Sequence, residues 1–168
     1  MSIAPFASLR EVLRIGTTGH YHGRPFAAAP LVGVAAARSL TASAPDDAAV
    51  TALLTNSNPA RFDDLYAALT PATRALMDEL SPLTRVAHVL APVEILSSPD
   101  DPFFPVDESL ALAAAGRDVR LTVTPALEHV RPRRRPGLVR VAAALDRTLR
   151  RAGDDERRRP APRPSPAL

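Results

Sequence analysis

Two stretches in the second half of the chain show the apolar pattern of neighbouring strands. The first is a short apolar run, VEIL at residues 93–96, which Ala91-Pro92 precedes and a polar turn follows. The second, residues 119–124, alternates Val, Leu and Val with Arg, Thr and Thr, which predicts a strand with one apolar side. The apolar residues 1–7 predict the end of one further strand.

Helical patterns fill the remaining segments. Apolar positions at helical spacing predict helices near residues 9–15, 31–40, 46–55, 60–69, 70–80, 105–115 and 138–151. Asp46 or Asp47 is a candidate cap, and Thr70-Pro71 is a typical helix start that should turn Leu76, Met77 and Leu80 inward. Gly16 to Gly23 predicts a loop, and Gly116 ends the helix before it.

These elements predict an α/β fold. We expect a small, mostly parallel sheet of the last strands, a helical insert over residues 31–82 and a C-terminal helix, all within one domain of residues 1–151. Residues 152–168 are rich in Arg and Pro and poor in large apolar side chains, so they are predicted to be a disordered tail.

The loops after the two main strands carry ionisable side chains. Asp100 and Asp101 follow the first strand, and Glu128 and His129 follow the second. In open α/β sheets the reacting groups lie beyond the carboxyl ends of the strands. Asp101 and His129 are therefore a candidate acid and base, with Asp100 as the alternative acid.

The order of strand, two small residues, an Asp-Pro-x-x-Pro turn, helix, strand, loop and histidine resembles the C-terminal portion of α/β-hydrolase-fold enzymes. The resemblance runs from about residue 80 to residue 149. It implies that Asp101, four residues before Pro105, is the triad acid and that His129 is the general base. It also implies a serine-hydrolase mechanism, a small ester-type or amide-type substrate, and a cap-like role for the helical insert. Ser98 stands where many members have glycine.

The nucleophile that this family requires has no candidate in the sequence. No G-x-S-x-G is present, and the nearest pattern, Gly19 to Gly23, has tyrosine at its centre and no strand before it. In the family's order the nucleophile would precede residue 1. We therefore expect the chain to be inactive alone, and to associate with itself or with a complementary N-terminal half.

Composition excludes several other chemistries. The chain has no cysteine, which rules out disulfides, thiolate catalysis and cysteine-based zinc sites. His20, His22, His88 and His129 do not form a known metal motif, and no glycine-rich phosphate-binding motif is present, so we predict no metal and no cofactor.

The uneven distribution of charge along the chain supports an alternative hypothesis. Residues 131–168 contain 12 arginines against 4 acids, whereas residues 1–130 contain 9 arginines against 14 acids. A basic end can bind nucleic acid. The second hypothesis is therefore a non-catalytic helical module that contacts nucleic acid or an acidic partner. All basic residues are arginine, which suggests codon bias and makes a nucleic-acid partner the weaker hypothesis. No apolar run is long enough for a membrane span, and we expect a cytoplasmic protein.

Overall fold

A three-stranded parallel sheet lies at the centre of the fold in the computed structural model, which describes residues 1–3, 5–26, 47–129, 131–132 and 137–158. The strands are β1 (Ser2–Ile3), β4 (Val93–Ser97) and β5 (Val119–Val123), and they lie in the order β1-β4-β5. Leu96 of β4 pairs with Ile3 on one side and Thr122 on the other. The protein is thus of the mixed α/β type, as the sequence predicts.

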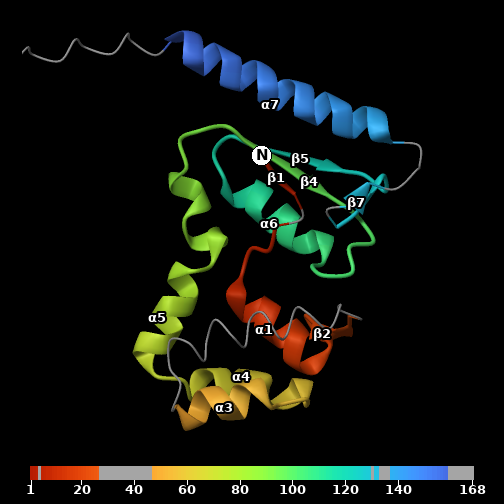
Figure 1. Ribbon diagram of the computed structural model, residues 1–168. Helices are drawn as coiled ribbons and strands as arrows, with labels where there is room; N and C mark the ends of the chain where they lie inside the picture. Colours follow the sequence, from red (N-terminus) through yellow and green to blue (C-terminus); the bar gives the residue numbers. More distant parts are fainter. Residues whose placement is uncertain (4, 27–46, 130, 133–136, 159–168) are drawn as a thin grey trace, which may run out of the picture.

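Helices cover both faces of this sheet. Helix α6 (Val106–Ala115) packs on one face and α7 (Leu138–Arg158) lies across the other (Figure 1). Successive side chains of a strand point to opposite faces, so Ile95 of β4 packs with Leu112 of α6 while Leu96 packs with Ala144 of α7. This two-sided burial explains why the successive positions 95 and 96 of β4 are both apolar.

One charged residue of β4 is nevertheless buried. Glu94 is 2% exposed and lies on the α7 side of the sheet. Its two carboxylate oxygens accept hydrogen bonds from Nε and an Nη of Arg147, each at 3.1 Å. These bonds lower the pKa of the Glu94 carboxyl. The ion pair therefore anchors α7 to the central strand.

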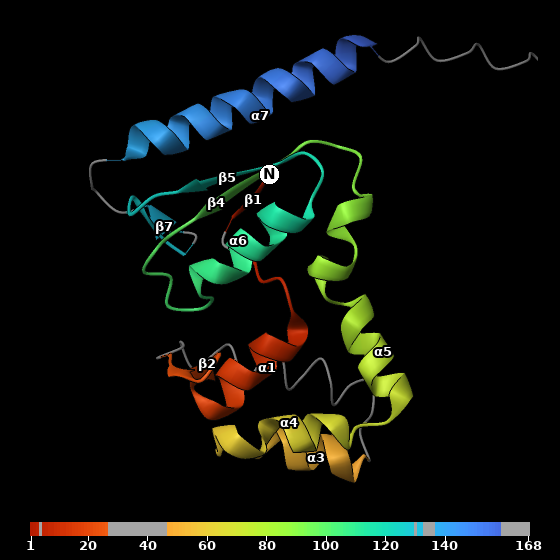
Figure 2. The same cartoon turned by 180° about the vertical axis from the view of Figure 1, so that it is seen from behind.

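A separate group of helices, the helical unit, fills the chain between β1 and β4. It contains α1 (Leu9–Thr18), α3 (Ala48–Leu54), α4 (Phe62–Ala67) and α5 (Pro71–Glu79), with 3-10 turns at Pro59–Arg61, Pro82–Thr84 and Val86–His88. The unit lies on the α6 side of the sheet, away from α7 (Figure 2). Leu13, Leu53, Phe62 and Met77 form the centre of its own core. The packing thus extends the unit back to Leu9, well before residue 31, and the helix predicted at 31–40 lies outside the described residues.

Capping side chains stand where the sequence predicts them at the starts of α3 and α5. Asp47 Oδ1 accepts the N–H groups of Ala49 and Val50 at the start of α3, and Thr70 Oγ1 accepts the N–H of Thr73 at the start of α5. The predicted caps are therefore confirmed. Leu80 was expected to point inward, but it is 49% exposed because α5 ends at Glu79.

The predicted loop over residues 16–23 is wrong. Helix α1 continues to Thr18, and Gly19 ends it with φ +66°. Strands β2 (His20–Tyr21) and β3 (Arg24–Pro25) then form a tight hairpin whose two turn residues, His22 and Gly23, both have positive φ. The glycines therefore serve a helix end and a hairpin turn.

Of two predicted helix ends, the one at Gly116 is confirmed and the one at Arg151 is wrong. Gly116 ends α6 in an extended conformation with φ −83°, and a Cβ there would lie 2.0 Å from Val119 Cγ2, so close packing requires this glycine. Helix α7 continues to Arg158, beyond the predicted end at Arg151, because the sequence has no proline before Pro160. Residues 159–168 of the predicted tail lie outside the described residues.

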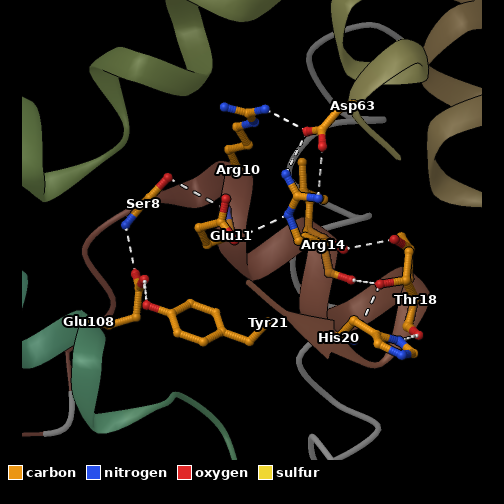
Figure 3. Close-up of polar contacts among 11 residues, drawn as sticks. Ser8, Arg10, Glu11, Arg14, Thr18, His20, Tyr21, Asp63 and Glu108 are labelled. Atoms are coloured by element: carbon orange, nitrogen blue, oxygen red, sulfur yellow. Dashed lines mark hydrogen bonds and ion pairs between the residues drawn. The ribbon is translucent and has the colours of Figure 1, made fainter. Parts of the chain in front are cut away.

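A buried carboxylate joins the helical unit to the sheet. Glu108 of α6 accepts hydrogen bonds from the N–H groups of Ala7 and Ser8 through Oε2, at 2.8 and 2.9 Å, and from the Tyr21 hydroxyl through Oε1, at 3.0 Å (Figure 3). Burial, together with the Glu108 charge, raises the pKa of Tyr21 well above its ordinary value. The N–H of Leu83 also donates to the Ala7 carbonyl at 3.0 Å. These contacts fix both ends of the helical unit beside α6.

No helix in the described part of the chain combines the length and the apolarity that crossing a membrane requires.

Candidate acid–base site

Asp101 lies in the loop between β4 and α6, beyond the carboxyl end of the central strand. Its side chain is fully buried, and its Oδ1 accepts the N–H groups of Phe103 and Phe104 at 2.8 and 3.0 Å. An Asp side chain that binds the backbone two residues on stabilises a turn. The two N–H groups therefore fix one carboxylate oxygen and leave the other available.

His129 lies beyond the carboxyl end of the neighbouring strand, β5. It follows β6 (Leu127–Glu128), which pairs with β7 (Arg131–Pro132) in a short hairpin. His129 has φ +52°, in the left-handed region that residues other than glycine rarely occupy. Such a conformation costs of order 1–3 kcal/mol, and residues of this kind cluster at active sites.

The two side chains are hydrogen-bonded to each other. Asp101 Oδ2 lies 3.0 Å from His129 Nδ1, and the His129 side chain is 21% exposed. An ionised carboxylate can only accept, so Nδ1 carries a proton and donates it. In the neutral ring Nε2 is then unprotonated, which is the state of a general base.

Phenyl rings and a small hollow surround the imidazole. The ring centroids of Phe103 and Phe104 lie 4.3 and 5.9 Å from that of His129. A hollow of about 270 Å³ is lined by Pro102, Phe103, Glu128, His129 and Arg131. Within the described residues no hydroxyl is hydrogen-bonded to His129 Nε2. The pair therefore has room for a small reactant, and this part of the chain supplies no partner for its basic nitrogen.

Other residues singled out from the sequence lie elsewhere. Asp100 is exposed, so Asp101 is the acid that meets the histidine. His20 Nδ1 forms a hydrogen bond with the Thr18 carbonyl at 2.9 Å, and the Tyr21 hydroxyl donates a hydrogen bond to Glu108. The described residues contain no group of three His, Cys, Asp or Glu side chains that could hold a metal ion.

Sequence reasoning did not single out Phe103. It contributes both an N–H to Asp101 and a ring to His129, and it lies two residues after the acid. The only signal was an aromatic pair in the turn, Phe103-Phe104, in a chain with few aromatic residues. Its position over the imidazole depends on how the chain folds around His129, 26 residues later.

The fold and the site define an α/β protein with an Asp–His pair at the carboxyl edge of a parallel sheet. Comparisons with protein-family models, with curated proteins and with solved structures found no match to this chain.

Proposed function

We propose that Asp101 and His129 are the acid and base of a hydrolase that cleaves ester, amide or related acyl bonds by a Ser-His-Asp type of mechanism, as the resemblance to α/β hydrolases implies. The nucleophile comes from a segment outside this sequence, since the sequence contains no G-x-S-x-G. The substrate is a small molecule that carries the acyl bond.

The observation that carries the proposal is the 3.0 Å hydrogen bond from His129 Nδ1 to Asp101, with the second oxygen of the acid fixed by two N–H groups. The topology supports it too. The acid and the base follow adjacent parallel strands, so both lie at the edge of the sheet where α/β enzymes place reacting groups. The left-handed backbone at His129 is a third support.

Asp101 and His129 have different roles in the proposed reaction. His129 Nε2 takes the proton of the incoming hydroxyl as its oxygen attacks the acyl carbon, and then gives that proton to the departing alcohol or amine. Water repeats the sequence, releases the acid and returns the hydroxyl to its starting state. Asp101 stays ionised, holds the ring in the required tautomer and stabilises the imidazolium.

The test uses the protein as it is assembled in its own cells, purified through a tag on this chain. Hydrolysis of p-nitrophenyl esters and p-nitroanilides is measured for wild type, His129→Ala and Asp101→Ala. We expect each substitution to lower kcat by at least about 10³-fold, as removal of a triad member does in known hydrolases. The control is His88→Ala, since His88 is exposed.

Hydrolysis that survives in His129→Ala, or wild-type protein that hydrolyses no member of the panel, would overturn the proposal. The isolated 168-residue chain should not react with a fluorophosphonate, because it has no serine in a nucleophile motif. Covalent labelling of that chain, detected by intact mass, would show that the nucleophile lies within it.

A further inference from the structure

The contacts of Phe103 go beyond those of an ordinary core residue. We propose that Phe103 is a positioning residue for the acid–base pair: its N–H orients the Asp101 carboxylate, and its ring holds the plane of the His129 imidazole. The inference rests on the proposed function, because it assigns Phe103 a role in that same site.

The backbone of Phe103 acts on the acid. Its N–H lies 2.8 Å from Asp101 Oδ1, while Oδ2 faces His129 at 3.0 Å. With a partner on each oxygen, the carboxylate cannot rotate without breaking a charge-assisted hydrogen bond in a buried setting. Every residue except proline supplies this N–H at position 103, so substitutions there separate the effect of the ring from that of the backbone.

The ring of Phe103 acts on the base. Among the described residues, the imidazole has one hydrogen bond, at Nδ1, and this bond alone does not fix the tilt of the ring plane. The phenyl centroid lies 4.3 Å from the imidazole centroid with 34° between the planes, which is a tilted stacking contact. The π face also attracts the imidazolium that forms when Nε2 takes up a proton.

The core of the helical unit holds the phenyl ring in place. Phe103 packs against that core although it lies in the loop between β4 and α6. The orientation of the imidazole is thus coupled to the helical unit. Phe104 is a matched control: its N–H bonds the same oxygen at 3.0 Å, but its ring is 5.9 Å from His129 and inclined at 60°.

The experiment is ¹⁵N NMR of the full chain labelled at histidine, recorded about two pH units above the ordinary histidine pKa of about 6.5. Wild type should show His129 as a single tautomer protonated at Nδ1, with a ring-current shift on its carbon-bound protons. Phe103→Ala and Phe103→Leu should lose the ring-current shift and give nitrogen shifts averaged between the two tautomers. Phe103→Tyr should restore both signals, and Phe104→Ala should retain the single tautomer.

Each outcome has a separate meaning. A single Nδ1-protonated tautomer in Phe103→Ala would overturn the role of Phe103 and leave the proposed function standing. If Phe104→Ala has the same effect as Phe103→Ala, the contribution is general packing and the role of Phe103 is overturned. If wild type itself lacks the Nδ1-protonated form, the acid–base pair fails and both proposals fall. Phe103→Leu preserves apolar bulk, so an unfolded Phe103→Ala variant does not decide the question alone.

Discussion

At the scale of single residues, Asp63 shows how the helical unit depends on charge. Its carboxylate accepts hydrogen bonds from Arg14 at 2.6 and 3.2 Å and from Arg10 at 2.6 Å, which ties α4 to α1 (Figure 3). The bonds from Arg14 are the main reason that the pKa of Asp63 lies below its ordinary value. The Asp63 side chain is 58% exposed, so solvent screens the pair and its contribution is modest.

This contact predicts a pH-dependent loss of stability in acid. A carboxyl whose pKa is lower in the folded state stabilises the fold above the unfolded value, about 3.9, and the contribution is lost as pH falls through the folded value. Wild type should therefore exceed Asp63→Asn in free energy of unfolding by a constant margin from pH 7 to about pH 4, and the margin should shrink below that. Urea unfolding followed by circular dichroism at several pH values measures it.

The control for this pH series is Asp64→Asn. Asp64 is the exposed neighbour of Asp63, and its side chain makes no ion pair within the described part of the chain. A margin for Asp63→Asn that persists unchanged to about pH 2 would contradict the prediction.

Sequence alone predicted the capping residues and the polar turn that contains Asp101, because short-range rules govern both. Asp47 and Thr70 act within three residues of themselves, and the turn at Asp101 is equally local. The same local rules correctly predicted that Gly116 ends α6, but they did not predict its extended conformation. Its role comes from Val119 across a close contact, which no rule about helix ends contains.

At the scale of elements, α7 is held to the sheet by few but specific contacts. Val139 and Leu149 remain 81% and 71% exposed, so much of the helix surface is unburied in this chain. Ala144 is fully buried against the sheet, and three residues further on Arg147 reaches Glu94. The buried ion pair therefore has a large share in docking the helix.

Arg147→Ala should lower the free energy of unfolding measurably, because it leaves the Glu94 carboxylate buried with weaker compensation. The loss should be smaller than for a fully buried pair, since Arg147 is 30% exposed and Arg151 remains 3.7 Å from Glu94. Chemical unfolding measures the difference.

The matched control is Arg150→Ala on the same helix. Arg150 pairs with Asp146 at the surface, where solvent screens the charges, so its removal should leave the free energy of unfolding almost unchanged. Equal effects of the two substitutions would show that Glu94 is not held by Arg147.

The strands β4 and β5 were predicted from sequence because their apolar positions form clear patterns. Adjacent apolar residues in β4 indicate burial on two faces, and alternating apolar residues in β5 indicate burial on one. The partner of Glu94 could not be predicted, because it lies 53 residues away on an element whose docking face the sequence does not specify. The same limit applies to β2 and β3. Two residues each are too few to show a period, and their pairing depends on the turn at His22-Gly23.

At the scale of the whole molecule, Glu108 joins the two parts of the fold. Three buried or half-buried donors from the β1–α1 connection and the β2–β3 hairpin converge on its carboxylate. Glu108→Gln replaces an acceptor with an amide donor, which leaves at least one of these groups unsatisfied. We expect a loss of about 2 kcal/mol in the free energy of unfolding.

The neighbouring substitution Asp107→Asn is the control for Glu108→Gln. The Asp107 side chain is 47% exposed and, among the described residues, forms an ion pair with the exposed Arg24, so its replacement should cost less than about 0.5 kcal/mol. Tyr21→Phe should give an intermediate loss of about 1 kcal/mol, because it removes one of the three hydrogen bonds. A Glu108→Gln variant as stable as Asp107→Asn would contradict this account of the junction.

The hydrogen bond between Leu83 N–H and the Ala7 carbonyl has a consequence for how such a protein can be altered. Both residues lie in the chain between β1 and β4, Ala7 near its start and Leu83 near its end, and one 3.0 Å hydrogen bond joins them. The segment between Ala7 and Leu83 therefore begins and ends at neighbouring points of the fold. A loop of a few residues can replace this segment and preserve the pairing of β1 with β4. Evolution or protein engineering can therefore replace the helical unit as a whole. The acid–base site is retained only if the replacement again packs against Phe103.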